Sequence, residues 1–178
     1  MSRNRYVGDY HLADSLDERR RIHTDVEYTG SPYSFTGTPE EVRRGKQRAL
    51  ILCAAGWLAY VGAMIPPSAA MRTFYSAIPF VLIAVPLALL TGTAAETFPL
   101  RERFEHRYAD RLENRFPASS AFVVILSALS LAGEAVNLIR GKALLTGDIV
   151  FAACGAAVLA AGAAAHRTGK LLKCGKVE

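Results

Sequence analysis

Four long apolar runs constrain this chain more than any other feature of its sequence. They cover residues 49–65, 73–95, 119–139 and 149–165, and Glu134 is the one charged residue within them. Because an α-helix rises 1.5 Å per residue, a run of about 20 residues crosses a hydrocarbon layer about 30 Å thick. The sequence therefore predicts an all-α integral membrane protein with four transmembrane helices.

The segments between these runs divide the chain into five parts. Thr38, Pro39 and Glu41 form a capping box with proline at the first helical position, which predicts the start of a helix. Pro79 and Pro86 interrupt the second run, and we interpret it as one kinked span because neighbouring helices in a bilayer can bond the freed carbonyl groups. The expected parts are a β-rich N-terminal element at 1–37, a first helical hairpin at 38–95, an amphipathic connector at 96–117, a second helical hairpin at 118–166 and a basic tail at 167–178.

Polar and apolar residues alternate in the N-terminal element, as they do in half-buried strands. The segment 22–28 places Ile, Thr, Val and Tyr on one face, a similar alternation occurs at 6–12, and a Gly-Ser-Pro turn at 30–32 precedes Tyr33 and Phe35. This pattern predicts a small three-stranded β-meander. The alternative is a tail that becomes ordered only when it is bound.

The connector combines an apolar stripe with a cationic flank. Apolar residues recur every four positions from Leu100 to Phe116, and an arginine directly precedes each of the last four. A helix with this pattern is typical of a membrane surface, and Pro117 is expected to end it. The residues from which we expect lipid contacts are Arg103, Arg107, Arg111, Arg115, Phe104 and Tyr108.

Lysine and arginine are distributed unevenly around the four runs. Of the 21 basic residues, 18 precede the first run, lie in the connector or follow the fourth run, and 3 lie in the two short loops. The positive-inside rule then places both termini and the connector in the cytoplasm. Short spans rich in alanine and glycine favour a bacterial cytoplasmic membrane.

Small residues in the fourth run predict close helix packing. Alanines recur at four-residue spacing with two glycines beside them: Ala152, Ala156, Ala160 and Ala164, with Gly155 and Gly162. Small side chains let helix backbones approach closely in lipid. We expect this helix to be internal or to form an oligomer seam.

Glu134 is the candidate functional residue, because an ionisable side chain within a span is costly and faces a partner, a cavity or water. Ser127, Ser130 and Asn137 fall on the same side of the helix at offsets of three and four residues. This set is a possible intramembrane polar site that responds to protons or cations. The alternative is that Glu134 lies near the outer boundary and pairs with Arg140 or Lys142.

No constellation in the sequence specifies a reaction, so an enzyme is not expected. A nucleophile with a base, paired carboxylates and phosphate-binding glycine loops are all lacking, and no cofactor is predicted. A metal site is not expected either, although His11 and His23 with Asp9 and Asp25 could meet across a hairpin. The basic residues expected in the cytoplasm explain the net charge of +5, so binding of nucleic acid is not expected. We interpret Cys174 as an ordinary reduced cysteine rather than a lipidation site.

Two functional hypotheses follow from these features. The first is a small accessory, assembly or regulatory subunit that acts through protein and lipid contacts, with a protein partner or further copies of itself. The alternative is a small homo-oligomeric transporter or channel that uses Glu134. In having four spans and one intramembrane glutamate the chain resembles the small multidrug-resistance exporters. It differs from them in its long N-terminal element, its charge bias and a glutamate in the third span, so no residue is carried across.

Overall fold

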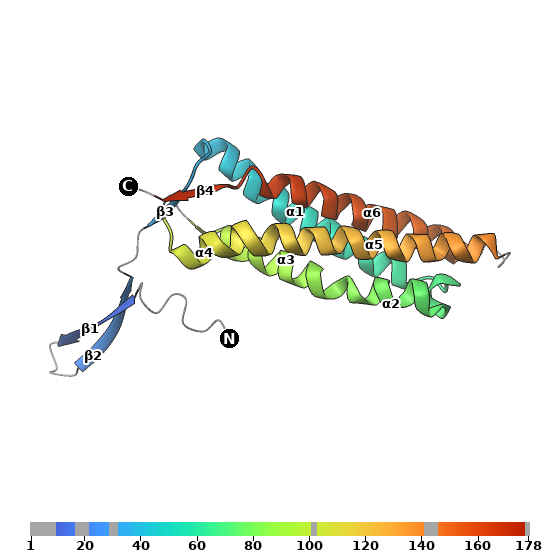
Figure 1. Cartoon of the computed structure of the whole chain (residues 1–178), viewed down its shortest axis with the longest axis horizontal. Coiled ribbons are helices and arrows are strands. Elements are labelled where there is room, and N and C mark those ends of the chain that lie inside the picture. Colours follow the sequence, from blue (N-terminus) through green and yellow to red (C-terminus); the bar gives the residue numbers. More distant parts are fainter. Residues whose placement is uncertain (1–9, 17–21, 29–31, 101–102, 141–145, 177–178) are drawn as a thin grey trace.

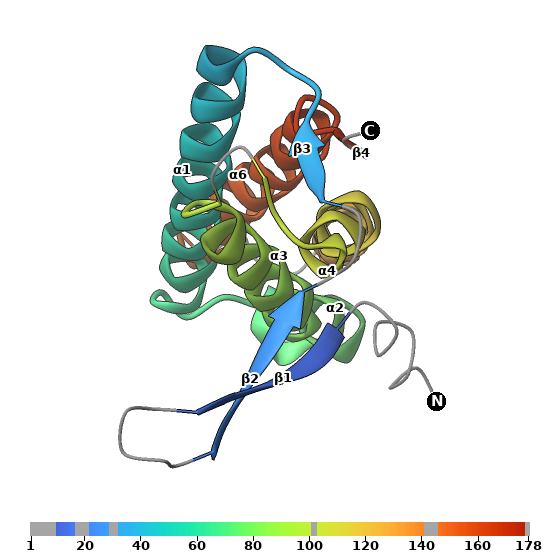
Figure 2. The same cartoon turned by 90° about the vertical axis from the view of Figure 1, so that its left-hand side faces the viewer.

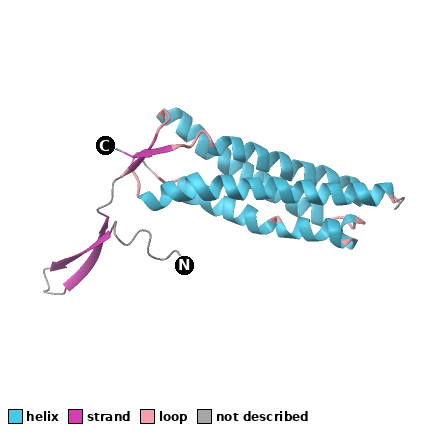
Figure 3. Ribbon diagram, in the orientation of Figure 1, coloured by secondary structure: helices cyan, strands magenta, loops and turns pink. Residues whose placement is uncertain are grey.

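The computed structural model describes residues 10–16, 22–28, 32–100, 103–140 and 146–176. Most of the chain is a bundle of long helices, and short strands lie at one end of it (Figures 1 and 3). In chain order the elements are β1(Tyr10–Leu16), β2(Ile22–Tyr28), β3(Tyr33–Phe35), α1(Pro39–Met64), η2(Ala70–Arg72), α2(Phe74–Leu82), α3(Ala84–Thr97), α4(His106–Asp110), η3(Arg111–Arg115), α5(Phe116–Ile139), α6(Thr146–Gly169) and β4(Cys174–Lys176).

Four stretches of helix are long and apolar enough to cross a membrane. They are Pro39–Met64, Phe74–Thr97, His106–Ile139 and Thr146–Gly169. At most 33% of each apolar window is buried inside the protein, so the outside of the bundle carries large apolar side chains such as Leu58 and Ile65. The prediction of a mainly helical protein with four helices of membrane-spanning length is therefore confirmed.

The capping box predicted at Thr38 is present and begins α1. The Thr38 backbone N–H donates to the Glu41 carboxylate at 3.1 Å, and the Glu41 backbone N–H donates to the Thr38 hydroxyl at 3.4 Å. These bonds satisfy two of the backbone groups that a helix start leaves unpaired. The helix then continues without interruption to Met64, just before Pro66.

The second candidate span is broken once, between α2 and α3. Pro86 has no N–H to donate to the carbonyl of Leu82, four residues earlier, and its ring would clash with that carbonyl in a regular helix. The chain forms a tighter turn at this point, in which the Ile83 N–H bonds to the Phe80 carbonyl at 3.1 Å. The predicted kink at proline is thus present.

The connector differs from the prediction in two respects. No helix includes Arg103 and Phe104, because the Phe104 backbone forms a β-bridge with Tyr33 and α4 begins only at His106. Pro117 does not end the connector either, since α4, η3 and α5 form one continuous helical stretch. The π-helical η3 explains this: the Phe116 N–H bonds to the Arg111 carbonyl, five residues earlier, which widens the helix where a proline ring would otherwise clash.

The four long helices pack side by side, as the view along the bundle in Figure 2 shows. Helix α1 packs against α6 and α3, and α5 packs against α6, α2 and α3. We call the end that carries β3, β4 and the start of α1 the basic end, and the end that carries residues 65–73 and 146–148 the short-loop end. One buried apolar cluster lies around Phe116 and Leu172 near the basic end, and a second surrounds Phe80 and Phe151.

Glycines rather than the alanine row make the close contact of α6. Gly155 and Gly162 are buried, whereas Ala156 and Ala160 are exposed. A Cβ atom at Gly162 would lie 2.8 Å from a Val123 methyl group, so α5 side chains occupy the space that the glycine leaves. The close packing expected on this helix is present at Gly155 and Gly162, and an oligomer seam at the exposed alanines stays a prediction.

The predicted three-stranded meander is wrong in its third strand. β1 and β2 form an antiparallel hairpin with Tyr10 opposite Tyr28, and in Figure 1 this hairpin stands apart from the helices. β3 pairs instead with β4 at the other end of the sequence, with Phe35 opposite Cys174. The bridge between Tyr33 and Phe104 adds a third segment, so three distant parts of the chain meet across the basic end.

Candidate functional site

The predicted polar residues of α5 lie together on its buried face. Ser127, Ser130 and Asn137 are each 1% exposed, and Glu134 is 3% exposed. Ser130 and Asn137 bond to α2 and to its N-terminal residue Thr73. The set is therefore part of the contact between two helices of membrane-spanning length.

Two serines join α2 and α5 near the centre of this contact. The Ser76 hydroxyl donates to the Ser130 carbonyl at 3.1 Å, and the Ser130 hydroxyl donates to the Ser76 carbonyl at 3.1 Å. Gly133 permits the close approach, because a Cβ atom there would lie 3.0 Å from the Tyr75 carbonyl oxygen and from the Ser76 Cα. Such paired interhelical bonds stabilise helix contacts in a membrane.

Asn137 is the centre of a second group of bonds at the short-loop end. Its amide nitrogen donates to the Thr73 hydroxyl at 3.0 Å and to the Glu134 carboxylate at 3.2 Å. Its amide oxygen accepts from the Tyr75 hydroxyl. A primary amide has two N–H donors, and both are used here. Asn137 therefore connects α5 to the start of α2 through two bonds, to Thr73 and Tyr75, and its third bond holds Glu134 on the same helix.

Among the described residues, Glu134 is joined to this group by its bond to Asn137. The Arg140 side chain is exposed, and its guanidinium lies over the Tyr75 ring at 5.8 Å, so it forms no ion pair with Glu134. Lys142, the other predicted partner, lies outside the described residues. The carboxylate is thus held within the helix contact, and neither of the two surface pockets described below includes it.

Ser127 behaves differently from the other members of the stripe. Its hydroxyl is buried and has no hydrogen-bond partner among the described residues. An unpaired buried hydroxyl destabilises a folded protein, so this position contributes no bond to the contact.

Asp148 is a buried acid that the sequence interpretation treated only as part of a helix start signal. It is 3% exposed, and its carboxylate accepts the Ala69 backbone N–H at 2.6 Å. The neighbouring Gly147 lies so close to Pro67 that a Cβ atom would be 2.0 Å from the Pro67 carbonyl oxygen. An acid after glycine at the start of a span could have indicated this contact, but the sequence gives no sign of its partner.

The predicted lipid-contact residues of the connector are divided between protein contacts and the surface. Phe104 is 7% exposed and its ring lies 4.8 Å from that of Phe35, so it faces the protein interior rather than lipid. Arg111 pairs with Glu96, and Arg107 pairs with Glu105 at 3.4 Å and lies over the Tyr108 ring at 4.8 Å. Arg103 and Arg115 are exposed, and lipid contact by the exposed residues stays a prediction.

A serine–histidine pair occurs at the basic end, where the sequence interpretation found no partner for a serine. The Ser120 hydroxyl lies 3.1 Å from His166 Nδ1 and donates to the Pro117 carbonyl at 2.9 Å. Ser120 is completely buried, so a substrate has no access to its oxygen. The pair is better explained as a contact between α5 and α6.

Cys174 lies in β4, half-buried beside a pocket of about 280 Å³ whose lining includes Glu113 and His166. Burial raises the pKa of its thiol to about 12, the charge of Glu113 adds to the rise, and that of Lys46 opposes it. A thiol protonated at neutral pH is a weak nucleophile. These surroundings favour a structural cysteine.

The hairpin register separates the two histidines that were considered for a metal site. His11 lies opposite Glu27 and His23 lies opposite Ser15, so the two are about four residues apart along the hairpin, roughly 13 Å. Asp9 lies outside the described residues. Within the described part of the chain, no group of three His, Cys, Asp or Glu residues could hold a metal ion.

No protein family, curated protein or solved structure matches this chain. Its function is therefore argued from its own residues.

Proposed function

We propose that the protein is inserted in a membrane through its four long helices, as two helical hairpins with both termini in the cytoplasm. The exposed apolar surface of the bundle supports insertion, because large apolar faces are stable when lipid covers them. The distribution of basic residues supports the orientation, since 18 of the 21 basic residues precede the first apolar run, lie in the connector or follow the fourth run.

Within that membrane we propose a role as a small accessory, assembly or regulatory subunit that acts through protein and lipid contacts. One observation carries this proposal: two of the polar side chains of α5, Ser130 and Asn137, are used in bonds to α2 and its N-terminal residue. Ser130 is paired with Ser76, and both N–H donors of Asn137 are taken by Thr73 and Glu134. A transport site needs polar groups that exchange partners with water or substrate, whereas these groups hold two helices together.

The strand arrangement supports a protein partner. The β1–β2 hairpin has only two strands, and a sheet of that size needs a further strand or a covering surface to be stable in water. No described strand pairs with either outer edge, so each edge has backbone groups that an extended segment of another protein can bind. By contrast, β3 belongs to the bundle through β4.

Affinity purification of a tagged copy in mild detergent, followed by mass measurement of the intact assembly, tests this role. We expect a second membrane protein in a fixed ratio, and loss of that protein when residues 1–31 are deleted. A deletion that extends to residue 37 is the less useful variant, because it also removes β3 and the Thr38 cap region. Recovery of masses that are only multiples of 19.2 kDa would contradict the proposal.

Burial of Glu134 supports the second candidate, a homo-oligomeric transporter or channel. Ionisable residues in membrane spans usually serve a function, and Glu134 is 3% exposed within a helix that could span the membrane. Glu134→Gln keeps the size and the acceptor for Asn137 but removes the charge. If the protein is a transporter, proteoliposomes made with Glu134→Gln should lose pH-dependent flux, and those made with Ser130→Ala should keep it. Unchanged flux in Glu134→Gln would exclude a transport role for Glu134.

A further inference from the structure

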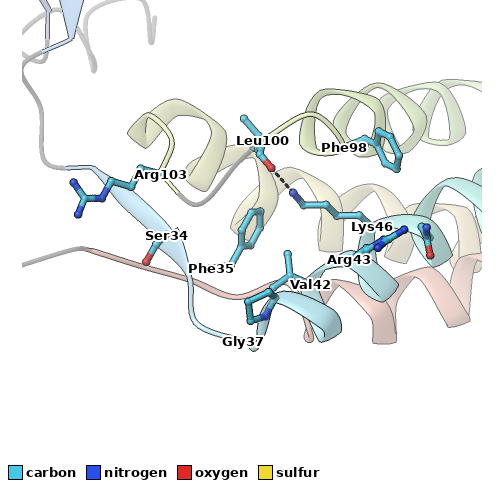
Figure 4. Close-up of a pocket in the computed structure, with 11 residues that line it drawn as sticks. Ser34, Phe35, Gly37, Val42, Arg43, Lys46, Phe98, Leu100 and Arg103 are labelled. Atoms are coloured by element: carbon cyan, nitrogen blue, oxygen red, sulfur yellow. Dashed lines mark hydrogen bonds between the residues drawn. The ribbon is translucent and has the colours of Figure 1, made fainter.

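A pocket of about 910 Å³ opens at the basic end, between the first turns of α1, the residues that follow α3, and β3 (Figure 4). Its described lining includes three cationic side chains, Arg43, Lys46 and Arg103, and none of the described lining residues is acidic. No described residue forms an ion pair with any of the three. The pocket therefore presents positive charge that the described part of the protein does not neutralise.

Lys46 is fixed at the centre of this pocket. Its ammonium group donates to the Leu100 carbonyl at 2.5 Å and lies 4.5 Å from the centre of the Phe35 ring. In Figure 4 Arg43 lies beside Lys46 on α1, whereas Arg103 lies beyond Phe35 and extends away from Lys46. A lysine ammonium has three N–H donors, and one of them is used by Leu100. An anion in the pocket could accept a bond from the other donors of Lys46, and the exposed arginine side chains add positive charge to the same pocket.

Apart from Ser34 and Gln47, the remaining described lining has no polar side chain, and it lies at the level where the uncharged helices begin. Lys46 precedes the uncharged run that starts at Ala49 by less than one turn. Phe98 caps the end of α3 and is 50% exposed, and Ile51 on α1 is 66% exposed. Cationic groups beside an exposed apolar surface suit a ligand that has an anionic group and a hydrocarbon part.

We propose that this pocket binds the phosphate-bearing headgroup of an anionic phospholipid, with the acyl chains along Phe98 and the apolar surface of α1. Lys46 and the two arginines bind the phosphate group. This site differs from the arginine row of the connector, because two of its three cations come from α1. The proposal deepens the lipid contacts of the proposed function and rests on membrane insertion.

Native mass spectrometry of the full chain in neutral detergent, titrated with phosphatidylglycerol or phosphatidylcholine, tests the site. We expect phosphatidylglycerol to bind more tightly than phosphatidylcholine. Lys46→Gln should weaken that binding about fivefold, and Arg43→Gln with Arg103→Gln should weaken it about 25-fold, since each cation near an anionic lipid contributes about a factor of five.

The matched control is the double variant Arg48→Gln with Arg167→Gln, which loses the same charge from exposed positions outside the pocket. It should retain binding within about twofold. Both arginines of the pocket variant are exposed and make no ion pair with a described residue, so this variant should fold even if Lys46→Gln does not.

Three results would overturn the proposal. The first is equal weakening by the control and the pocket variants, which would mean unspecific attraction to a basic surface. The second is equal binding of the two lipids. The third is displacement of phosphatidylglycerol by an equal concentration of glycerol 3-phosphate, which would mean a soluble phosphate ligand. Retention of the protein in carbonate-washed membranes checks insertion separately, so failure of the lipid site is distinguishable from failure of the proposed function.

Discussion

Ser127 and Ser130 should respond to alanine substitution in opposite directions. They lie on the same helix face, three residues apart, and each is 1% exposed. The Ser130 hydroxyl donates to the Ser76 carbonyl at 3.1 Å, whereas the Ser127 hydroxyl has no partner among the described residues. The two positions thus differ in bonding while they match in burial and helix context.

The expected magnitudes follow from these contacts. Ser130→Ala removes one interhelical bond and should lower the free energy of unfolding by about 0.6 kcal/mol, and at most about 1.7 kcal/mol. Ser127→Ala removes an unpaired buried hydroxyl and should raise the free energy of unfolding by about 1 kcal/mol. Any change in helix propensity is the same in both variants and cancels in their difference, which should be about 1.5 kcal/mol.

Reversible unfolding in mixed micelles with increasing sodium dodecyl sulfate, followed by circular dichroism, measures this difference. Wild type, the two single variants and the double variant should give additive changes, because the two side chains share no partner. If Ser127→Ala destabilises the protein as much as Ser130→Ala does, the Ser127 hydroxyl has a partner and the assignment of bonds on this face of α5 is wrong.

Three further predictions test other contacts. Gly147→Ala should lower the free energy of unfolding by about 3 kcal/mol, because its Cβ would lie 2.0 Å from the Pro67 carbonyl oxygen. Gly92→Ala should raise the free energy of unfolding by up to about 1 kcal/mol, because a Cβ at Gly92 would have nothing within 4 Å. Equal thermal shifts for the two variants would contradict this prediction. Asn137→Leu removes three bonds and should lower the free energy of unfolding by about 2 kcal/mol in the same unfolding assay. An effect no larger than that of Ser130→Ala would show that the bonds around Asn137 are not formed. With Cys53 and Cys154 replaced by alanine, a maleimide at pH 8 should label Cys174 slowly in the folded protein and rapidly after unfolding. The pKa of the Cys174 thiol is about 12 in the folded protein, above its ordinary value of 9.0. The free energy of unfolding should therefore be constant below about pH 9 and should fall as the pH rises towards 12.

The parts of the fold that could be predicted are those set by local sequence. The Thr38 cap, the four long helices and the break before Pro86 each depend on residues within one or two turns of each other. The polar face of α5 was also predicted, because residues at offsets of three and four share a side of any helix. Its partners on α2 were not predicted, since nothing in the spacing of the α5 residues indicates which helix lies opposite.

The errors arose where distant segments meet or where one pattern fits two structures. The pairing of β3 with β4 joins residues more than 130 positions apart, and alternation within a strand does not identify its partner. Phe104 continues a four-residue apolar period but lies in a bridge to Tyr33, because tertiary contacts override a local helical pattern. Pro117 normally ends a helix, and only the wider turn at η3 lets the helix continue.

The two ends of the bundle differ in how they can exchange ligands. At the short-loop end, Gly147 lies against Pro67, Asp148 accepts from Ala69 and Asn137 bonds to Thr73, so backbone and side chains are closely joined. At the basic end, the contact of β3 with β4 and the bridge to Phe104 leave a pocket with cationic groups that no described residue pairs with. The pocket at the basic end therefore presents cationic groups that a ligand can reach without breaking a described contact between helices, and for this reason the lipid proposal is directed to that end.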